Sequence, residues 1–370
     1  MNEQPPALAW PANLQLPPDT VTVVYLDLNH WISLAQASVG HPKGGSFLET
    51  LEACRSAQKS GTAIFVLSAL HYMEMNKIKD PEQRWAVAGV MEDLSDFASL
   101  TSRILVMELE LATMLDRFAR EPIVLPTVRL LGRGVRHSFG LSSGIRITGP
   151  GGDATALVRE RIGAEAFDQW VNEAELLLGR SVLRGPADGE QDELRSFGWN
   201  PEASIAVAED RASQERDQSR TLDTEERWRR GRLRDVVSAR ELMIEFQNLL
   251  PRALAERNLN LTDVVIDPQS ARSFVRAMPS SEVSIELKTA WHRNGGKQWS
   301  ANDIYDLDAL SLAVPYCDVV VTDKACHHAL TVARLGERMH TALLRRIEDL
   351  PQAIETWKPK RPPFESSTEA

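Results

Sequence analysis

The sequence predicts an α/β protein in which a parallel sheet flanked by helices is interrupted by a large α-helical insertion. Apolar, β-branched segments alternate with helical patterns in residues 21–119, and the alternation returns in residues 301–357. This rhythm is typical of a parallel sheet covered by helices. Residues 120–300 instead carry helical patterns separated by breakers, without a repeat. We therefore expect one domain around a helical cap, with a flexible leader at 1–20 and a flexible tail at 358–370.

The first part of the domain contains three predicted strands and four helical stretches. Segment 21–26, with the sequence VTVVYL, is apolar on both faces, which is typical of a buried strand. Ser68 follows the second strand and can cap the next helix. The expected strands are 21–26, 63–67 and 104–106, and the helical stretches begin near Trp31, Ser46, Ala69 and Pro81.

The insertion and the second part follow the same logic. In the insertion we expect helices at 154–183 and 202–250, a loop at 185–201, and a stop at Pro251. In the second part we expect a helix at 303–314, a strand at 318–322, a helix at 325–335 and a final helical stretch.

Composition restricts the class of protein. The 42 basic and 52 acidic side chains give a formal charge of −10, so a nucleic-acid partner has to be met by a local basic patch. The three cysteines, Cys54, Cys317 and Cys326, form no CxxC pair and are expected to fill the core in a reducing compartment. No apolar run is long enough to cross a bilayer, so we expect no membrane partner and a cytoplasmic location.

Four acidic residues lie where predicted strands end or on the helix that follows: Asp27, Glu74, Asp306 and Asp323. The carboxyl ends of parallel strands line the crevice in which ligands bind, so these residues are expected to converge. Carboxylates held so close repel one another unless a cation neutralises them, and hard oxygen ligands suit Mg²⁺ or Mn²⁺. A cation held in this way supplies the chemistry of a metal-dependent nuclease.

The same segments resemble the ordered acidic motifs of PIN-domain nucleases. The resemblance rests on YLDLNHWI at 25–32, on 68–74, on DLDALSLA at 306–313 and on VVVTD at 319–323. It implies a Rossmann-like sheet and Mg²⁺- or Mn²⁺-dependent cleavage of single-stranded or structured RNA, in a family that includes toxin ribonucleases. The middle of the chain lies outside it.

The resemblance also assigns roles to individual residues. Asp27, Glu74, Asp306 and Asp323 are the first to fourth catalytic and metal-binding acids, and Asn29 and Thr322 are supporting residues. The family often carries another acid soon after the fourth, whereas Lys324, Ala325 and Cys326 follow here. One metal ion or two therefore remain open alternatives.

The third acid is ambiguous because Asp303, Asp306 and Asp308 compete for it. Asp303 and Asp306 are three residues apart and share a helix face, whereas Asp308 points elsewhere. We expect Asp306 to be the third acid and Asp303 to be a supporting metal ligand. The alternative for Asp303 is a structural role at a helix N-terminus capped by Ser300 or Asn302.

Two basic segments are candidates for contact with RNA. Residues 122–152 contain no acid, and their arginines, near Phe139, could follow a phosphate backbone: Arg129, Arg133, Arg136 and Arg146. The second segment, 227–234, is flanked by acids and is better explained as a solvated, ion-paired helix. His30 and His71 flank the acids and are expected to pack.

These observations favour a metal-dependent endoribonuclease, in a toxin, defence or RNA-processing setting, with RNA and an inhibitory protein as candidate partners. One alternative is an inactive scaffold of the same fold that binds proteins through its long helices. Another is a structure-specific DNA nuclease, since one sequence does not reveal a preference for the 2′-hydroxyl.

Overall fold

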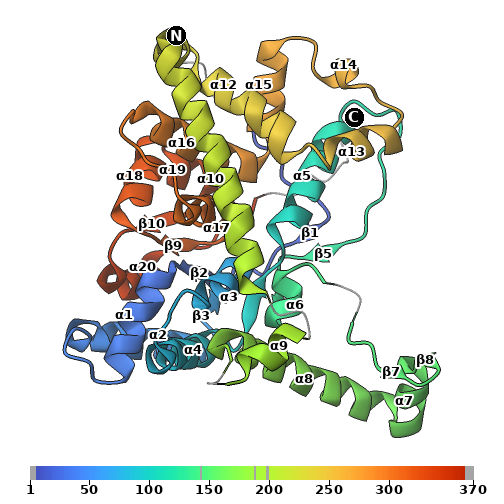
Figure 1. The fold of residues 1–370 in the computed structure, drawn as a ribbon, viewed down its shortest axis with the longest axis vertical. Coiled ribbons are helices and arrows are strands. Elements are labelled where there is room, and N and C mark those ends of the chain that lie inside the picture. Colours follow the sequence, from blue (N-terminus) through green and yellow to red (C-terminus); the bar gives the residue numbers. More distant parts are fainter. Residues whose placement is uncertain (1–5, 142–143, 187–188, 197–199, 363–370) are drawn as a thin grey trace.

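The computed structural model describes residues 6–141, 144–186, 189–196 and 200–362. It confirms a mixed α/β architecture with a parallel sheet flanked by helices (Figure 1). The four-stranded sheet has the order β3-β2-β9-β10, and every neighbouring pair is parallel. Because β9 and β10 come from the second part of the chain, the two ends do form one sheet. In the described residues no helix is both long enough and apolar enough to cross a membrane.

The first part begins with β1 and runs to α5. Its elements are β1 Leu14–Gln15, β2 Thr22–Leu26, α1 Leu28–Ser38, η1 Gly45–Phe47, α2 Leu48–Lys59, β3 Ala63–Val66, α3 Ala69–Met75, α4 Pro81–Ser95, β4 Ala98–Leu100 and α5 Arg103–Asp116.

The middle is mainly helical. Its elements are β5 Val128–Arg129, β6 Leu131–Arg133, α6 Gly134–Ser138, β7 Thr148–Gly149, β8 Gly152–Asp153, α7 Thr155–Ile162, α8 Ala164–Arg184, α9 Gln191–Ser196, α10 Pro201–Thr224, α11 Glu226–Gly231, α12 Leu233–Arg240, η2 Glu241–Glu245, α13 Leu250–Glu256, α14 Leu261–Val264, α15 Pro268–Arg276 and α16 Pro279–Arg293.

The last part returns to the sheet. Its elements are α17 Ala301–Tyr316, β9 Val319–Val321, α18 Lys324–Val332, α19 Leu335–Met339, β10 Ala342–Leu344, η3 Ile347–Asp349 and α20 Leu350–Thr356.

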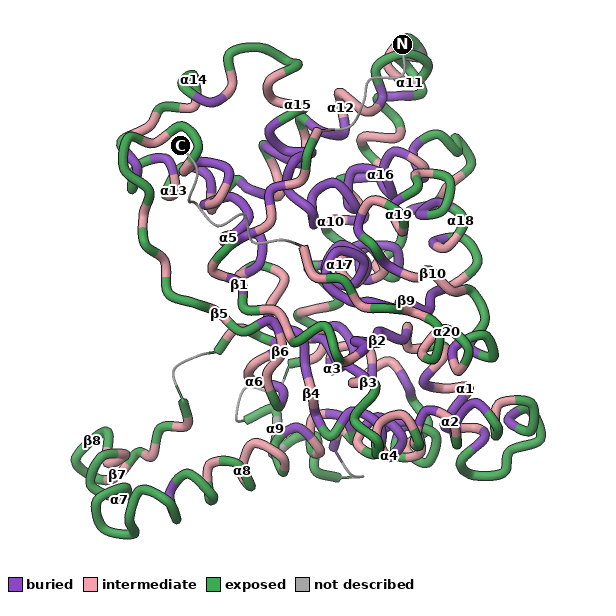
Figure 2. The backbone as a smooth tube through the Cα atoms, turned by 180° about the vertical axis from the view of Figure 1, so that it is seen from behind, coloured by how far each residue is buried: buried purple, intermediate pink, exposed green. Residues whose placement is uncertain are grey.

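Successive residues of the central strand β2 are buried on opposite faces of the sheet. Val23 and Tyr25 join a core with α16 and α17, whereas Val24 and Leu26 join a core with α1, α2 and α4. This is the period of two expected for a strand covered on both sides. A third core lies among α5, α12, α13 and α15, away from the sheet. Figure 2 shows the buried trace running through all three regions.

Two of the expected elements are wrong. Residues 104–106 begin helix α5 rather than a strand, and the strand of this region is β4. A short apolar run cannot by itself distinguish a strand from a buried helix, and the apolar face of α5 continues to Leu115. The final helical stretch also contains the edge strand β10.

The termini are better packed than expected. In the leader, Leu14 is buried and pairs with β5, and the amide of Ala9 donates to the carbonyl of Ala277 over 2.8 Å. In the tail, Arg361 forms an ion pair with Asp318 over 2.6 Å. Residues within 6–20 and 358–362 thus contact the rest of the fold, and the flexibility of the leader and the tail stays a prediction; residues 1–5 and 363–370 lie outside the described residues.

The insertion also differs in detail. The helix expected at 154–183 is divided into α7 and α8 at Gly163, whose positive φ of 89° favours glycine. The loop expected at 185–201 contains α9, and its residues 187–188 and 197–199 lie outside the described residues. Finally, α16 packs in the same core as α17, so this helix belongs structurally to the sheet domain.

Candidate functional site

Asp27 and Asp323 end adjacent strands and cap the helices that follow. Leu26 pairs with Val321, so the strands β2 and β9 finish side by side. One carboxylate oxygen of Asp323 accepts hydrogen bonds from the amides of Ala325 and Cys326 over 2.5 and 3.2 Å. Asp27 accepts one longer bond, 3.4 Å, from the amide of Asn29. Capping fixes both carboxylates at the carboxyl edge of the sheet and leaves oxygen atoms for another partner.

Glu74 reaches this edge on α3. The start of α3 is tied to β2 by His71, because its Nε2 lies 2.8 Å from the carbonyl oxygen of Leu26 and its Nδ1 accepts from the amide of Ser68 over 3.0 Å. These contacts require a neutral ring that donates through Nε2. Burial lowers the pKa of His71 to about 4, which agrees with this state. His71 thus links the end of β2, one residue before Asp27, to the helix that carries Glu74.

Asp306, on α17, interacts electrostatically with the other three acids. Its pKa is raised to about 8, first by burial and then by the negative charges of Asp27, Glu74 and Asp323. The pKa of Asp27 is raised by burial and by Asp323, and that of Glu74 by burial and by Asp27, against the lowering effect of Lys77. Each carboxylate therefore experiences the charge of at least one other. We refer to Asp27, Glu74, Asp306 and Asp323 as the acidic site.

Two residues that lie beside the acidic site are not among those that the sequence predicts for it. Cys326, assigned to the core, has its sulfur grouped with carboxylate oxygens of Asp306 and Asp323, all within 4.8 Å of one another. Burial raises the pKa of its thiol well above the usual value, so the neutral thiol is a poor ligand and the carboxylates are the better donors. The spacing of three residues from Asp323 within one helical turn was the available signal.

Lys77 is the second residue that was missed. Its Nζ lies 3.2 Å from Oε1 of Glu74, 2.8 Å from Oδ1 of Asn302 and 3.7 Å from the centre of the Tyr305 ring. It supplies one positive charge at the edge of the acidic site. Glu74 and Lys77 are three residues apart on a predicted helix, which could have indicated the pair.

The three candidates for the third acid differ in the residues that they contact. Asp303 accepts from the amide and the hydroxyl of Ser300, each over 2.8 Å, and forms an ion pair with Lys297. This is the structural alternative, a capping box at the start of α17. The role of Asp303 as a supporting metal ligand would compete with these bonds.

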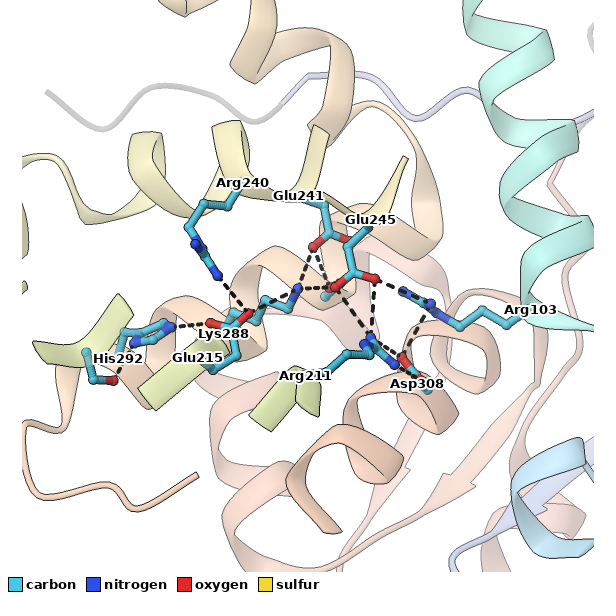
Figure 3. A network of polar contacts seen from close by, with 11 residues as sticks. Arg103, Arg211, Glu215, Arg240, Glu241, Glu245, Lys288, His292 and Asp308 are labelled. Carbon is cyan, nitrogen blue, oxygen red and sulfur yellow. Dashed lines mark hydrogen bonds and ion pairs between the residues drawn. The ribbon is translucent and has the colours of Figure 1, made fainter. Parts of the chain in front are cut away.

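Asp308 faces away from the acidic site into a buried polar network (Figure 3). Its two oxygens accept from Arg211 over 2.5 and 2.9 Å, and Arg103 lies 3.3 Å away. The expectation that Asp308 points elsewhere is confirmed.

The network continues between α10, η2 and α16. Lys288 lies 2.9 Å from Glu241, 2.8 Å from Glu245 and 3.7 Å from Glu215. Glu241 and Glu245 stand on η2, a single turn of π-helix, and the other members are Arg103, Arg211, Arg240, His292 and Asp308 (Figure 3). Because positive and negative groups alternate, the network ties the helical layer to α17 without an unpaired ion.

The remaining predicted residues occupy less informative positions. Asn29 is exposed on the first turn of α1, and Thr322 is buried with its amide donating to Leu344 over 3.0 Å. Their supporting role stays a prediction.

The arginines of the expected RNA-binding loop are only partly available. Arg133 forms an ion pair with Asp96 over 2.5 Å, and Arg136 forms one with Glu175 over 3.0 Å. Arg129 and Arg146 are exposed. The basic helix around Trp228 is ion-paired, as expected, through Arg227, Arg229, Arg232 and Arg234.

Comparisons with known proteins give no assignment. No protein-family model, no curated protein sequence and no solved structure matches this chain.

Proposed function

We propose that the chain is a metal-dependent endoribonuclease of the PIN-like type. The observation that carries the proposal is the acidic site, in which four carboxylates from both ends of the chain gather at the carboxyl edge of a parallel sheet, and burial and the neighbouring negative charges raise the pKa of Asp27, Glu74 and Asp306. A structural ion-pair network would pair such charges with cations. Here Lys77 is the one lysine or arginine that forms an ion pair with any of the four among the described residues, and it pairs with Glu74 alone. His30 also interacts with Asp27, but burial lowers the pKa of its ring and favours the neutral form.

The donor set fits Mg²⁺ or Mn²⁺. Carboxylate oxygens are the ligands that these hard ions prefer, and the repulsion among Asp27, Glu74, Asp306 and Asp323 is relieved by a divalent cation. Such an ion supplies Lewis-acid stabilisation of a phosphodiester oxygen and a more acidic water. One ion or two both agree with the four carboxylates.

The chain's own residues then have distinct tasks. Asp323 is held rigidly by two amides, so its free oxygen keeps its direction when a ligand binds. Lys77 is paired with Glu74 at the edge of the site. When the substrate binds, Lys77 can leave Glu74 and contact a phosphate oxygen instead. Hydrolysis of a phosphodiester at this site yields a 5′-phosphate and a 3′-hydroxyl.

The test is cleavage by the purified full-length chain. We expect single-stranded or structured RNA to be cut with Mn²⁺ or Mg²⁺ and to stay intact in EDTA. Asp27→Asn and Asp323→Asn should each lower the rate at least about a hundredfold, because each removes a metal ligand. Asp168→Asn is the matched control, since Asp168 is exposed on α8 and pairs with Arg159. The proposal fails if the two variants cut RNA as fast as the wild type.

The same assay separates the alternatives. Cutting of DNA of the same sequence, but not of RNA, would favour a structure-specific DNA nuclease. The absence of both cutting and Mn²⁺ binding would favour an inactive scaffold.

A further inference from the structure

A groove between α16 and α18 opens beside the acidic site. It encloses a cavity of about 330 Å³, which is within the range of small-ligand pockets, about 300–1,000 Å³. The two helices lie next to each other in both views (Figures 1 and 2). The floor is made of small or apolar side chains, and the polar side chains around it are Arg234, Glu286, Arg293, Asn294, Lys297 and His328. We refer to this cavity as the α16–α18 groove.

The groove adjoins the acidic site at two points. Ala325 lines it, and the amide of the same residue holds the carboxylate of Asp323 over 2.5 Å. Lys297 lines it as well, and Lys297 is ion-paired with Asp303, which precedes Asp306 by three residues on α17. The groove therefore lies next to a residue that holds Asp323 and to one that is paired on the first turn of the helix that carries Asp306.

Three basic side chains, Arg234, Arg293 and Lys297, and one acid, Glu286, line the groove, in a protein whose net charge is −10. Arg234 is already neutralised by Glu286, over 2.7 Å. Arg293 is exposed at the end of α16, and within the described parts of the chain no acid pairs with it. Lys297 is paired with Asp303, so Arg293 is the basic side chain of the groove that keeps its charge free. In the larger cavity beside the buried network, about 660 Å³, the lining arginines Arg103 and Arg211 are both paired.

Lys297 is held in place by a defined turn. Its amide donates to the carbonyl of Asn294 over 2.9 Å, and the amide of Gly296 donates to the side chain of Asn294 over 3.1 Å. A Cβ atom at Gly295 would lie 2.6 Å from a guanidinium nitrogen of Arg229, so this turn packs directly on α11. Lys297 also lies 5.3 Å from the centre of the Trp291 ring. Its position is thus fixed before any ligand arrives.

We propose that the α16–α18 groove binds the nucleotide next to the scissile phosphate of a single-stranded RNA, with Arg293 and Lys297 contacting its backbone. The inference rests on the proposed nuclease function and extends it to the path of the substrate. Cations are needed beside a site of four carboxylates, because an RNA strand would otherwise be repelled. The apolar floor offers a surface for a base or ribose, while the two cations face the phosphates.

The experiment measures binding separately from cleavage. The wild-type protein is titrated in EDTA, in which the RNA stays intact, with a short fluorescein-labelled single-stranded RNA, and anisotropy is followed over a series of salt concentrations. For single strands each lost phosphate contact lowers the salt slope by about 0.7, which corresponds to about fivefold weaker binding near 0.1 M salt. We expect this loss for Arg293→Ala, and about twice the change in slope when Lys297→Ala is added.

Three further variants make the result interpretable. Arg293→Ala alone leaves the pair of Lys297 with Asp303 intact, so a folding defect from loss of that pair cannot explain its effect. Arg252→Ala is the matched control, since Arg252 is exposed on α13 and pairs with Glu256. The double variant Arg129→Ala, Arg146→Ala tests the rival basic loop.

The possible outcomes separate this inference from the nuclease itself. If the wild type cuts RNA but Arg293→Ala leaves the salt slope unchanged, or the Arg129, Arg146 variant lowers it instead, the groove is overturned and the nuclease stands. If binding depends on Arg293 but the wild type cuts nothing with Mn²⁺, the nuclease is overturned and the groove remains an RNA site.

Discussion

Replacing Asp306 with Asn tests the repulsion inside the acidic site. The pKa of Asp306 rises to about 8 because the group is buried and faces the charges of Asp27, Glu74 and Asp323. At neutral pH and without a cation, its ionised form is therefore unfavourable. Asn has nearly the same shape and no charge, so we expect Asp306→Asn to stabilise the metal-free protein.

The magnitude follows from the same pKa. A rise from 3.8 to about 8 corresponds to roughly 6 kcal/mol, at about 1.36 kcal/mol for each tenfold change in proton affinity. This is an upper limit, since the side chain is partly exposed and the neighbouring acids can take up protons in its place. We expect a gain of about 2 kcal/mol in the free energy of unfolding at pH 8.

The sign of the pH dependence is also fixed. Between pH 4 and 8 the native state binds more protons at Asp306 than the unfolded state does, because its native pKa is the higher one. The free energy of unfolding therefore falls as the pH rises through this window. The variant should lack this part of the decline and should approach the wild type near pH 4.

The assay is urea denaturation of both proteins in EDTA from pH 4 to pH 8, repeated with Mn²⁺. A ligand at 100 times its dissociation constant raises the free energy of unfolding by about 2.7 kcal/mol. Because only the wild type is expected to bind Mn²⁺, the ion should make the wild type more stable than the variant. Asp308→Asn is the matched control on the same helix, and it should destabilise at every pH because Arg103 and Arg211 lose their partner. Equal stability and equal pH dependence of wild type and Asp306→Asn in EDTA would refute the reasoning.

Two further predictions concern buried polar contacts. Lys288→Met should lower the free energy of unfolding by about 3–5 kcal/mol in urea denaturation, because Glu241 and Glu245 lose their central cation; a loss below about 1 kcal/mol would contradict this. His71→Ala should lower the free energy of unfolding by about 2–4 kcal/mol and weaken Mn²⁺ binding, because it removes the hydrogen bonds that link Leu26 to Ser68. An unchanged affinity for Mn²⁺ would show that His71 only packs.

The positions of the four acids could be predicted because each depends on local rules. Asp27 and Asp323 follow strands that the apolar pattern identifies, and the ends of parallel strands meet at one edge. Asp306 and Asp308 are two residues apart on a helix and therefore point in different directions. Asp306 faces the acidic site and Asp308 faces the buried network. These inferences needed no long-range contact beyond the sheet itself.

The rest could not be obtained in this way because it depends on tertiary partners. The strand β10 is a half-buried triplet whose pairing with β9 is invisible in its own sequence. The burial of Leu14 depends on β5, which is more than a hundred residues away. The ion pairs that occupy Arg133 and Arg136 come from Asp96 and Glu175 on other elements, so an acid-free stretch of sequence overstated the free positive charge of the loop.

The central claim is that the four carboxylates form one cation site, and titration of the full chain with Mn²⁺ under calorimetry tests it most directly. We predict binding of one or two ions per chain to the wild type, and its loss in both Asp306→Asn and Asp323→Asn. Absence of Mn²⁺ binding by the folded wild type, or binding by the two variants as strong as that of the wild type, would contradict the account.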